Sequence, residues 1–333
     1  MDTTPKTLLE AVKFFAVPEN CIAYLSAKRW SNGVAVCPTC GGTKVSFLAK
    51  QQRWQCSARH PKRQFSIKVG TIFEDSPLGL DKWLPVVWLI VNCKNGISSW
   101  EVSRDLGVTQ KTAWFMLHRV RLAMQDDYTG GMLGGEVEVD ETFIGGKARN
   151  MHKDRKVEMQ KKGRNDGNKT IVLGILERAS GTKPKRVRTS IISDRKRQSI
   201  APEVEAHVKA GSEIHSDEFG NKWGMPDKYE HKMVDHLSSY VDGNVHTNGI
   251  ENFWSLLKRG VNGTYVSVEP FHLYRYVDEQ AFRFNTRKDG AGDIITDAER
   301  FGLAISQIVG KRLTYKALIG KAEDERPKEE VPF

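Results

Sequence analysis

The chain has 333 residues, enough for about two globular domains of ~150 residues each. Apolar residues, counted with glycine in place of tyrosine, make up about 45% of it, which excludes a disordered chain. Lysine and arginine number 51 against 41 aspartates and glutamates, a net charge of +10. In a globular protein, this net charge indicates a polyanionic partner, and the main alternative is a membrane surface.

No segment has the pattern of a membrane span or a secretion signal. The most apolar window, from Trp83 to Cys93, is far shorter than the ~18 uncharged residues of a spanning helix and contains a proline, so we expect a buried helix. The N-terminus has an acidic residue at position 2 and no small-residue cleavage site. We therefore expect a soluble, cytoplasmic protein with no membrane partner.

Residues 1–30 predict an amphipathic helical segment, and residues 31–75 predict small strands around a cysteine cluster. Cys37 and Cys40 form a C-x2-C knuckle followed by two glycines, and Cys56 and His60 follow after 15 residues. Three thiolates and an imidazole complete a closed tetrahedral shell, which indicates structural Zn²⁺. The alternative is three unrelated buried cysteines and a surface histidine. An odd cysteine count without a secretion signal argues against disulfides, and we expect the remaining two, Cys21 and Cys93, in the core.

Residues 78–126 are expected to be helical and contain a candidate helix-turn-helix. Ser98 or Ser99 can cap its first helix, Gly107 permits a tight turn, and Thr109 can cap its second helix. Ala113, Met116, Leu117 and Val120 are expected to face inward in that second helix. The side chains expected outward are types that contact phosphates or base edges: Gln110, Lys111, Thr112, His118, Arg119 and Arg121. We favour DNA binding over an ordinary helical hairpin.

Three strands are predicted next, and the first carries an acidic face. Glutamates and valines alternate from Glu136 to Asp140, so Asp140 shares a face with two glutamates, as in a strand that lines a metal cleft. The runs 170–176 and 187–192 are expected to be strands that pair consecutively with it. The basic stretch from Lys147 to Arg164 between them is expected to be either a solvated loop or an arm that follows DNA phosphates.

Two further segments can complete a divalent-metal site. After a predicted helix at 196–210, a strand ends at Asp217, and a later helix begins near Asn248 with Glu251 in its first turn. Two carboxylates on strands and a third on a helix can hold two divalent ions some ~4 Å apart, an arrangement that drives in-line attack at a phosphodiester. An oxygen-only site suits Mg²⁺ or Mn²⁺.

The remaining side chains of this predicted helix leave alternatives open. Lys258, seven positions after Glu251 on the same helix face, could hold a DNA phosphate, and Trp254 could stack on a base or simply pack. Carboxylates held so close together would repel without metal, so we expect partial protonation. Each acid taken alone could also be an ordinary surface residue.

The order of these motifs resembles the bacterial insertion-sequence transposases of the ISXO-like, zinc-ribbon group. The shared motifs are Val-Asp140-Glu-Thr-Phe-Ile-Gly-Gly-Lys, Ser-Asp217-Glu, His246-Thr-Asn248-x-x-Glu251-x-x-Trp254-x-x-x-Lys258-Arg-Gly and Phe282-Arg283-Phe284-Asn285. The resemblance implies an α/β RNase H-like DDE core in which Asp140 and Asp217 are the first two catalytic carboxylates. Because members of the group use either asparagine or glutamate in the third role, both Glu251 and Asn248 are candidates, and we favour Glu251 because a carboxylate binds Mg²⁺ better.

With that resemblance, the chain divides into a helical segment (1–30), a zinc ribbon (31–75), a helix-turn-helix region (76–128), an RNase H-like catalytic domain (133–290) and a helical tail (291–333). We expect a transposase that cleaves element ends and transfers the 3′-hydroxyl into target DNA. Its partners would be double-stranded terminal inverted repeats, target DNA and further copies of the chain, at the bacterial nucleoid. The alternatives are a non-catalytic DNA-binding regulator and an RNase H-like nuclease or resolvase without strand transfer.

Overall fold

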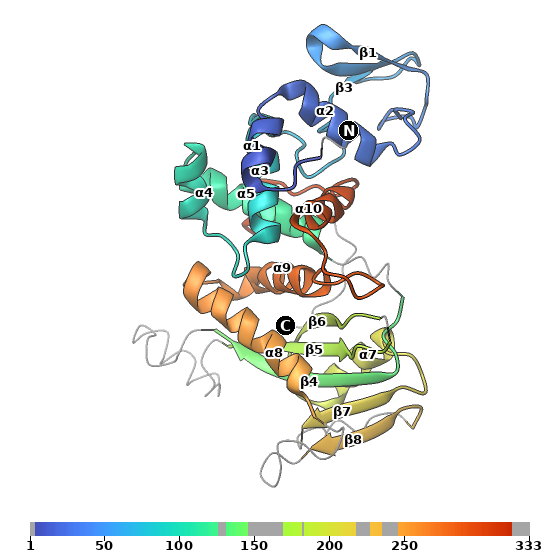
Figure 1. The fold of residues 1–333 in the computed structure, drawn as a ribbon, viewed down its shortest axis with the longest axis vertical. Helices are drawn as coiled ribbons and strands as arrows, with labels where there is room; N and C mark the ends of the chain where they lie inside the picture. Colours follow the sequence, from blue (N-terminus) through green and yellow to red (C-terminus); the bar gives the residue numbers. More distant parts are fainter. Residues whose placement is uncertain are drawn as a thin grey trace. The chain divides into compact units, whose positions relative to one another are not determined.

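A computed structural model describes residues 4–125, 131–145, 169–181, 183–217, 227–234 and 246–321, and the stretch from Lys147 to Arg164 lies outside these residues. They form two compact units, the first combining 4–125 with 295–321 and the second lying between 131 and 294 (Figure 1). In the described part of the chain, no helix is both long enough and apolar enough to cross a membrane.

The first unit is mainly helical. Its helices are α1 Leu8–Phe15, α2 Pro18–Arg29, α3 Leu80–Asn92, α4 Ser99–Leu106, α5 Gln110–Met124, α10 Asp297–Ser306 and α11 Tyr315–Leu318. Helix α3 is buried along most of its length, as the apolar window from Trp83 to Cys93 predicts, and it accommodates Pro85.

Helix α10 comes from the far end of the chain and completes this core. Phe301 is fully buried, and the centroid of its ring lies 5.6 Å from that of Phe15 and 5.2 Å from that of Trp88. Residues from the predicted C-terminal tail are therefore built into the N-terminal unit. No local pattern in the sequence signals this, because the contacts join segments more than 200 residues apart.

A three-stranded sheet follows α2. Strands β1 Val45–Leu48, β2 Arg53–Cys56 and β3 Gln64–Phe65 pair antiparallel in chain order. Its apolar core is small and centres on Trp54, whose ring packs edge-on to Trp30 and stacks against Phe65. This sheet carries one side of the cysteine cluster.

The turn between α4 and α5 forms as its sequence predicts. Ser98 rather than Ser99 caps α4, in a reciprocal capping box with Glu101. Gly107 has φ of 62°, in the left-handed region where glycine is favoured, and Thr109 caps α5 by accepting from the Thr112 amide. The two helices therefore pack as a hairpin with a short turn.

The second unit is a mixed five-stranded sheet in the order β6-β5-β4-β7-β8, with helices on both faces (Figure 1). The strands are β4 Glu136–Ile144, β5 Thr170–Glu177, β6 Arg186–Ile192, β7 Glu213–Asp217 and β8 Glu230–Val234. The first three are antiparallel and consecutive, as predicted, whereas β7 and β8 run parallel to β4. Strand β8 has no counterpart among the predicted elements.

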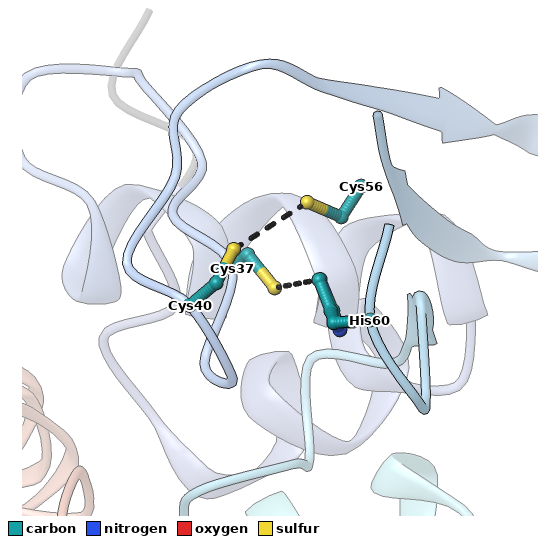
Figure 2. Close-up of side chains that lie close together, drawn as sticks. All are labelled: Cys37, Cys40, Cys56 and His60. Carbon is teal, nitrogen blue, oxygen red and sulfur yellow. Dashed lines mark hydrogen bonds between the residues drawn. The ribbon is translucent and has the colours of Figure 1, made fainter. Parts of the chain in front are cut away.

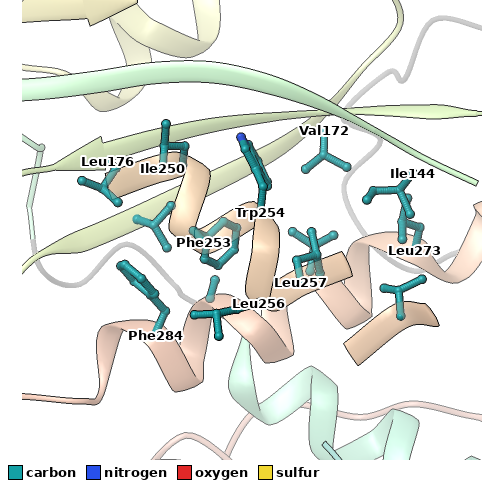
Figure 3. Packing of buried hydrophobic residues seen from close by; sticks show 14 residues of the cluster. Ile144, Val172, Leu176, Ile250, Phe253, Trp254, Leu256, Leu257, Leu273 and Phe284 are labelled. Carbon is teal, nitrogen blue, oxygen red and sulfur yellow. The ribbon is translucent and has the colours of Figure 1, made fainter. Parts of the chain in front are cut away.

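Two apolar layers cover the two faces of this sheet. The helices are α7 Arg197–His207, α8 Asn248–Arg259 and α9 Leu273–Asn285, and a π-helical turn at Gly260–Tyr265 and a short 3-10 turn at Pro270–His272 lie between α8 and α9. Helices α8 and α9 pack on one face with Val172 and Leu176 (Figure 3), and α7 packs on the other with Val137 and Val139. Helix α8 lies over β4 and β5, while α9 lies along β6.

Gly174 in β5 is what allows α8 to approach the sheet closely. It lies opposite Asp140 of β4, and a Cβ at this position would be 2.6 Å from the Trp254 ring and 2.7 Å from Ile250. The space above Gly174 is therefore filled by side chains of α8.

We expect Gly174→Ala to destabilise the protein by about 1–3 kcal/mol, because the added methyl group overpacks the contact with α8. Gly263→Ala is the matched control, since a Cβ there meets nothing within 4 Å. Urea unfolding followed by circular dichroism would measure both variants. Equal free energies of unfolding for the two would contradict this account of the packing.

Candidate functional site

The four predicted zinc ligands come together beside the three-stranded sheet. Their donor atoms, from Cys37, Cys40, Cys56 and His60, all lie within 4.8 Å of one another (Figure 2). The sulfurs of Cys40 and Cys56 are 3.7 Å apart, and the Cys37 sulfur is 3.5 Å from His60 Nε2. A tetrahedral zinc with Zn–S bonds of ~2.3 Å requires ligand separations of about 3.8 Å, so the cluster fits the ion.

The surroundings of the cluster prepare it for a cation. His60 Nδ1 lies 2.6 Å from the Pro61 carbonyl oxygen, which fixes the ring with Nε2 toward the thiolates. Burial opposes ionisation of Cys37, but hydrogen bonds from the Cys40 and Thr39 backbone outweigh it, so the pKa of this thiol falls to about 7. The cysteine cluster and the zinc-ribbon sequence together support structural Zn²⁺.

In the second unit, the two predicted aspartates lie on adjacent parallel strands. Strand β4 pairs with β7 so that Glu136 is opposite Glu213 and Glu138 is opposite His215. Continuing this register by two residues would bring Asp217, the last residue of β7, level with Asp140, and the two are near enough for the charge of Asp217 to raise the pKa of Asp140. Residues level with each other on parallel strands point to the same face, so both carboxylates lie on the face covered by α8.

Asp140 is held in an environment that disfavours its charge. Burial, followed by the negative charges of Glu141 and Asp217, raises the pKa of Asp140 to about 7. The Trp254 indole donates a hydrogen bond of 2.9 Å to one carboxylate oxygen, and the Glu141 amide donates one of 2.8 Å to the other. Trp254 is thus buried and oriented toward Asp140, so it packs rather than offering its ring to a base.

Helix α8 carries both candidates for the third ligand in its first turn. At about 100° per residue, Glu251 lies about 60° around the helix from Trp254, and Asn248 lies about 120° from it. Phe253, whose ring is 5.4 Å from Phe284, marks the flank that faces α9. Glu251 and Lys258 are exposed on the opposite flank, away from α9, and the Thr247 hydroxyl donates to Glu251 over 2.8 Å.

Asp140, Asp217 and Glu251 are not drawn together as tightly as the zinc ligands. Among the described residues, the cysteine cluster is the only group of three or more candidate ligands whose donor atoms converge. The donor set is nevertheless suited to a hard divalent cation, since it consists of carboxylates, and burial together with the negative charges of Glu141 and Asp217 raises the pKa of Asp140.

The sequence did not single out four charged residues that surround these acids. Glu138 is fully buried and contacts both Arg178 and the amino end of α8. Glu141 points to the opposite face of β4, where Arg195 donates to it over 3.2 Å. Glu138 was detectable as a member of the acidic strand face, whereas Arg178 lies just after β5 and gives no local signal.

The predicted DNA-contacting residues of α5 divide into two groups. At its amino end, Lys111 is exposed, while Gln110 and Thr112 are half-buried. The expectation that His118 and Arg119 point outward is wrong, because both are buried within the first unit, as is Arg121.

Arg119 shows why that expectation is wrong. Its guanidinium donates to the backbone carbonyls of Leu313 and Glu74, at 3.1 and 2.8 Å. At Arg119, the face expected to meet DNA is thus covered by the backbone of Glu74 and by the chain segment that returns after residue 295.

Comparisons with known proteins agree with the motifs. A family model described as "ISXO2-like transposase domain" matches residues 132–285, and one described as "Transposase zinc-ribbon domain" matches residues 18–59. The chain is also 25% identical, over 265 residues, to a Halobacterium salinarum protein described as an uncharacterized protein in transposable element ISH50. That alignment covers 74% of this chain and 84% of the relative.

We expect the purified protein to contain about one zinc ion per chain and Cys40→Ser to lose most of it, because three ligands cannot close the shell. Cys93→Ser is the control, since Cys93 lies outside the cluster. Elemental analysis after gel filtration in the presence of a chelator would measure the content. Equal zinc in both variants would exclude the cluster as the binding site.

We also expect Asp140→Asn to stabilise the metal-free protein increasingly as the pH rises. The folded-state pKa of Asp140 is about 7, against ~3.9 for an unfolded aspartate, so the wild type loses stability across that interval, because the unfolded aspartate ionises while the folded-state carboxyl group stays protonated. Asparagine keeps an acceptor for Trp254 and never ionises. The advantage of the variant should grow by on the order of 2 kcal/mol between pH 5 and pH 8, measured by urea unfolding with chelator. An advantage independent of pH would contradict the assignment.

Proposed function

Because the chain belongs to the ISXO-like, zinc-ribbon group of insertion-sequence transposases, we propose that it cleaves DNA at the ends of its element and joins the freed 3′-hydroxyl to target DNA. The observation that carries the proposal is the parallel pairing of β4 with β7, which supports a site formed by Asp140 and Asp217 on one face, together with the effect of the Asp217 charge on Asp140. Asp217 is the last residue of β7, so its carboxylate lies at a strand end beside its partner. This is where paired carboxylates serve phosphoryl transfer.

The sheet supports an RNase H-like catalytic domain. Three consecutive antiparallel strands are followed by two strands parallel to the first, with α7 on one face and α8 and α9 on the other. In this arrangement the first aspartate comes from the central strand β4, the second from its neighbour β7, and the third ligand from a helix packed over them.

Asp140, Asp217 and Glu251 would hold Mg²⁺ or Mn²⁺, two ions in our proposal. Such ions supply the acidity that water or a 3′-hydroxyl needs to attack a phosphodiester. The chain itself orients the first ligand, because Trp254 and the Glu141 amide each fix one oxygen of Asp140. Its raised pKa means that metal binding must displace a proton at neutral pH.

Glu251 is the better candidate for the third ligand. It is closer than Asn248 to the side of α8 that faces Asp140, and it lies away from α9. Helix α9 lies along β6, at the far side of the sheet from β7. The flank of α8 that points away from α9, where Glu251 lies, is therefore on the side of Asp217. Lys258 is exposed on the same flank, where its ammonium group could hold a DNA phosphate.

DNA binding is expected from the transposase and zinc-ribbon domains and from the net charge of +10. We propose that the terminal repeats are bound by the N-terminal unit, with α4 and α5 as a helix-turn-helix. Gln110, Lys111 and Thr112 open α5 and remain its candidate contacts, whereas the buried Arg119 is not one. Bringing two element ends together would require a homo-oligomer on DNA.

Strand transfer of a labelled element-end duplex into plasmid DNA tests the proposal. With Mg²⁺ we expect joined product from the wild type and a loss of about 100-fold or more from Asp217→Asn and Glu251→Gln, since each removes a charged ligand. Asn248→Ala should retain joining. The opposite pattern, with loss in Asn248→Ala and retention in Glu251→Gln, would move the third role to Asn248.

The same assay separates the alternatives. Cleavage of the correct ends without joining, given a free target duplex, would indicate a nuclease or resolvase. Binding of the ends with no metal-dependent cleavage would indicate a regulator on an inactive core.

A further inference from the structure

The amino end of α8 is seated on a buried carboxylate from another element. Glu138 of β4 has no exposed surface, and its Oε2 accepts a hydrogen bond of 2.8 Å from the Ile250 amide. Thr247, the residue at the N-cap position, makes no capping bond with its side chain. Glu138 therefore takes the part of the capping residue, and its negative charge also complements the positive end of the helix dipole.

Gly249 makes this contact possible. A Cβ at this position would lie 2.8 and 3.0 Å from the two carboxylate oxygens of Glu138. Any side chain larger than hydrogen would push the first turn of α8 away from β4. The glycine and the buried glutamate thus form one contact, although they lie 111 residues apart.

Arg178 ties the same carboxylate to the segment that leads into α8. Its Nε donates to Glu138 over 2.8 Å, and its Nη1 donates to Glu136 over 2.8 Å. Its Nη2 donates to the backbone carbonyl of His246, two residues before the helix begins. The guanidinium fork therefore fixes β4, the end of β5 and the entry to α8 relative to one another.

We propose that Glu138 and Arg178 are positioning residues for catalysis: they set the place of the first turn of α8, and with it Glu251, relative to Asp140 and Asp217. This inference rests on the proposed function of those acids. Neither positioning residue need touch DNA or metal. Their effect is to hold the first turn of α8 at a fixed distance from β4. Because Glu251 lies in that turn, its position is fixed as well.

Glu138→Gln tests the proposal, because glutamine keeps an oxygen for the Ile250 amide but loses the charge opposite Arg178. The matched control is Glu177→Gln. Glu177 is also a buried glutamate that accepts from a backbone amide, that of Gly134 at 2.9 Å, and pairs with an arginine, Arg186 at 3.2 Å. It follows Leu176, which packs against α8, so strand alternation directs Glu177 to the opposite face of the sheet. A general loss of stability would affect both variants alike.

Two measurements make the test independent of transposition. Hydrogen exchange without metal or DNA should be about 10-fold faster at residues 250–254 in Glu138→Gln than in Glu177→Gln. The Mn²⁺ dissociation constant, from electron paramagnetic resonance, should rise about 10-fold in Glu138→Gln only. In the strand-transfer assay, kcat should fall by a similar factor while the KM for end DNA stays the same. Equal exchange and equal Mn²⁺ affinity in the two variants would overturn the proposal.

Gly249→Ala provides a second variant should Glu138→Gln fail to fold. It breaks the contact from the other side, so it should reproduce the faster exchange and the weaker Mn²⁺ binding, with Gly263→Ala as its control. The effects of Gly249→Ala and Glu138→Gln should be less than additive in the double variant, since both disrupt one contact. Full additivity would overturn the proposal. If the exchange result holds but the wild type joins no DNA, the proposed function fails and the positioning contact stands.

Discussion

Helix α8 lies directly against the sheet because Gly174 leaves room for two of its side chains, and most features of the second unit depend on that contact. Trp254 fills the space and thereby delivers its indole N–H to Asp140. The close approach also lets Gly249 meet the carboxylate of Glu138 at the amino end of the helix. The position of Glu251 on α8 follows from these two fixed points.

The carboxylates of β4 lie in three different environments. Glu138 is matched by Arg178 and the amino end of a helix, and Glu141 is matched by Arg195 on the other face. Among the described residues, Asp140 accepts hydrogen bonds from neutral donors, the Trp254 indole and the Glu141 amide, and burial and neighbouring negative charge raise its pKa. Within the part of the chain that the structure describes, the strand thus compensates the charges of Glu138 and Glu141 but not that of Asp140, the carboxylate that we propose as a metal ligand.

In the first unit, the three-stranded sheet depends on the zinc ligands rather than on a large apolar core. The three-stranded sheet has a small apolar core, and the four zinc ligands join the knuckle at Cys37 to the strand that ends at Cys56. Metal–ligand bonds can supply folding energy that so little apolar burial does not. Elsewhere in the unit, Phe301 completes the helical core. The backbone carbonyl of Leu313 accepts a hydrogen bond from the guanidinium of Arg119.

The sequence by itself determined what depends on local order: the cysteine knuckle, the capped turn at Gly107, the alternation that gives β4 its acidic face, and the motifs that mark the family. Only the tertiary structure decided which faces were free. It covered Arg119 with a segment from the far end of the chain, and it turned Trp254 toward Asp140. It also placed Arg178 against Glu138 and the entry to α8. Periodicity reports the face of an element on which a side chain lies, but what packs against that face comes from residues that can be far away in the chain.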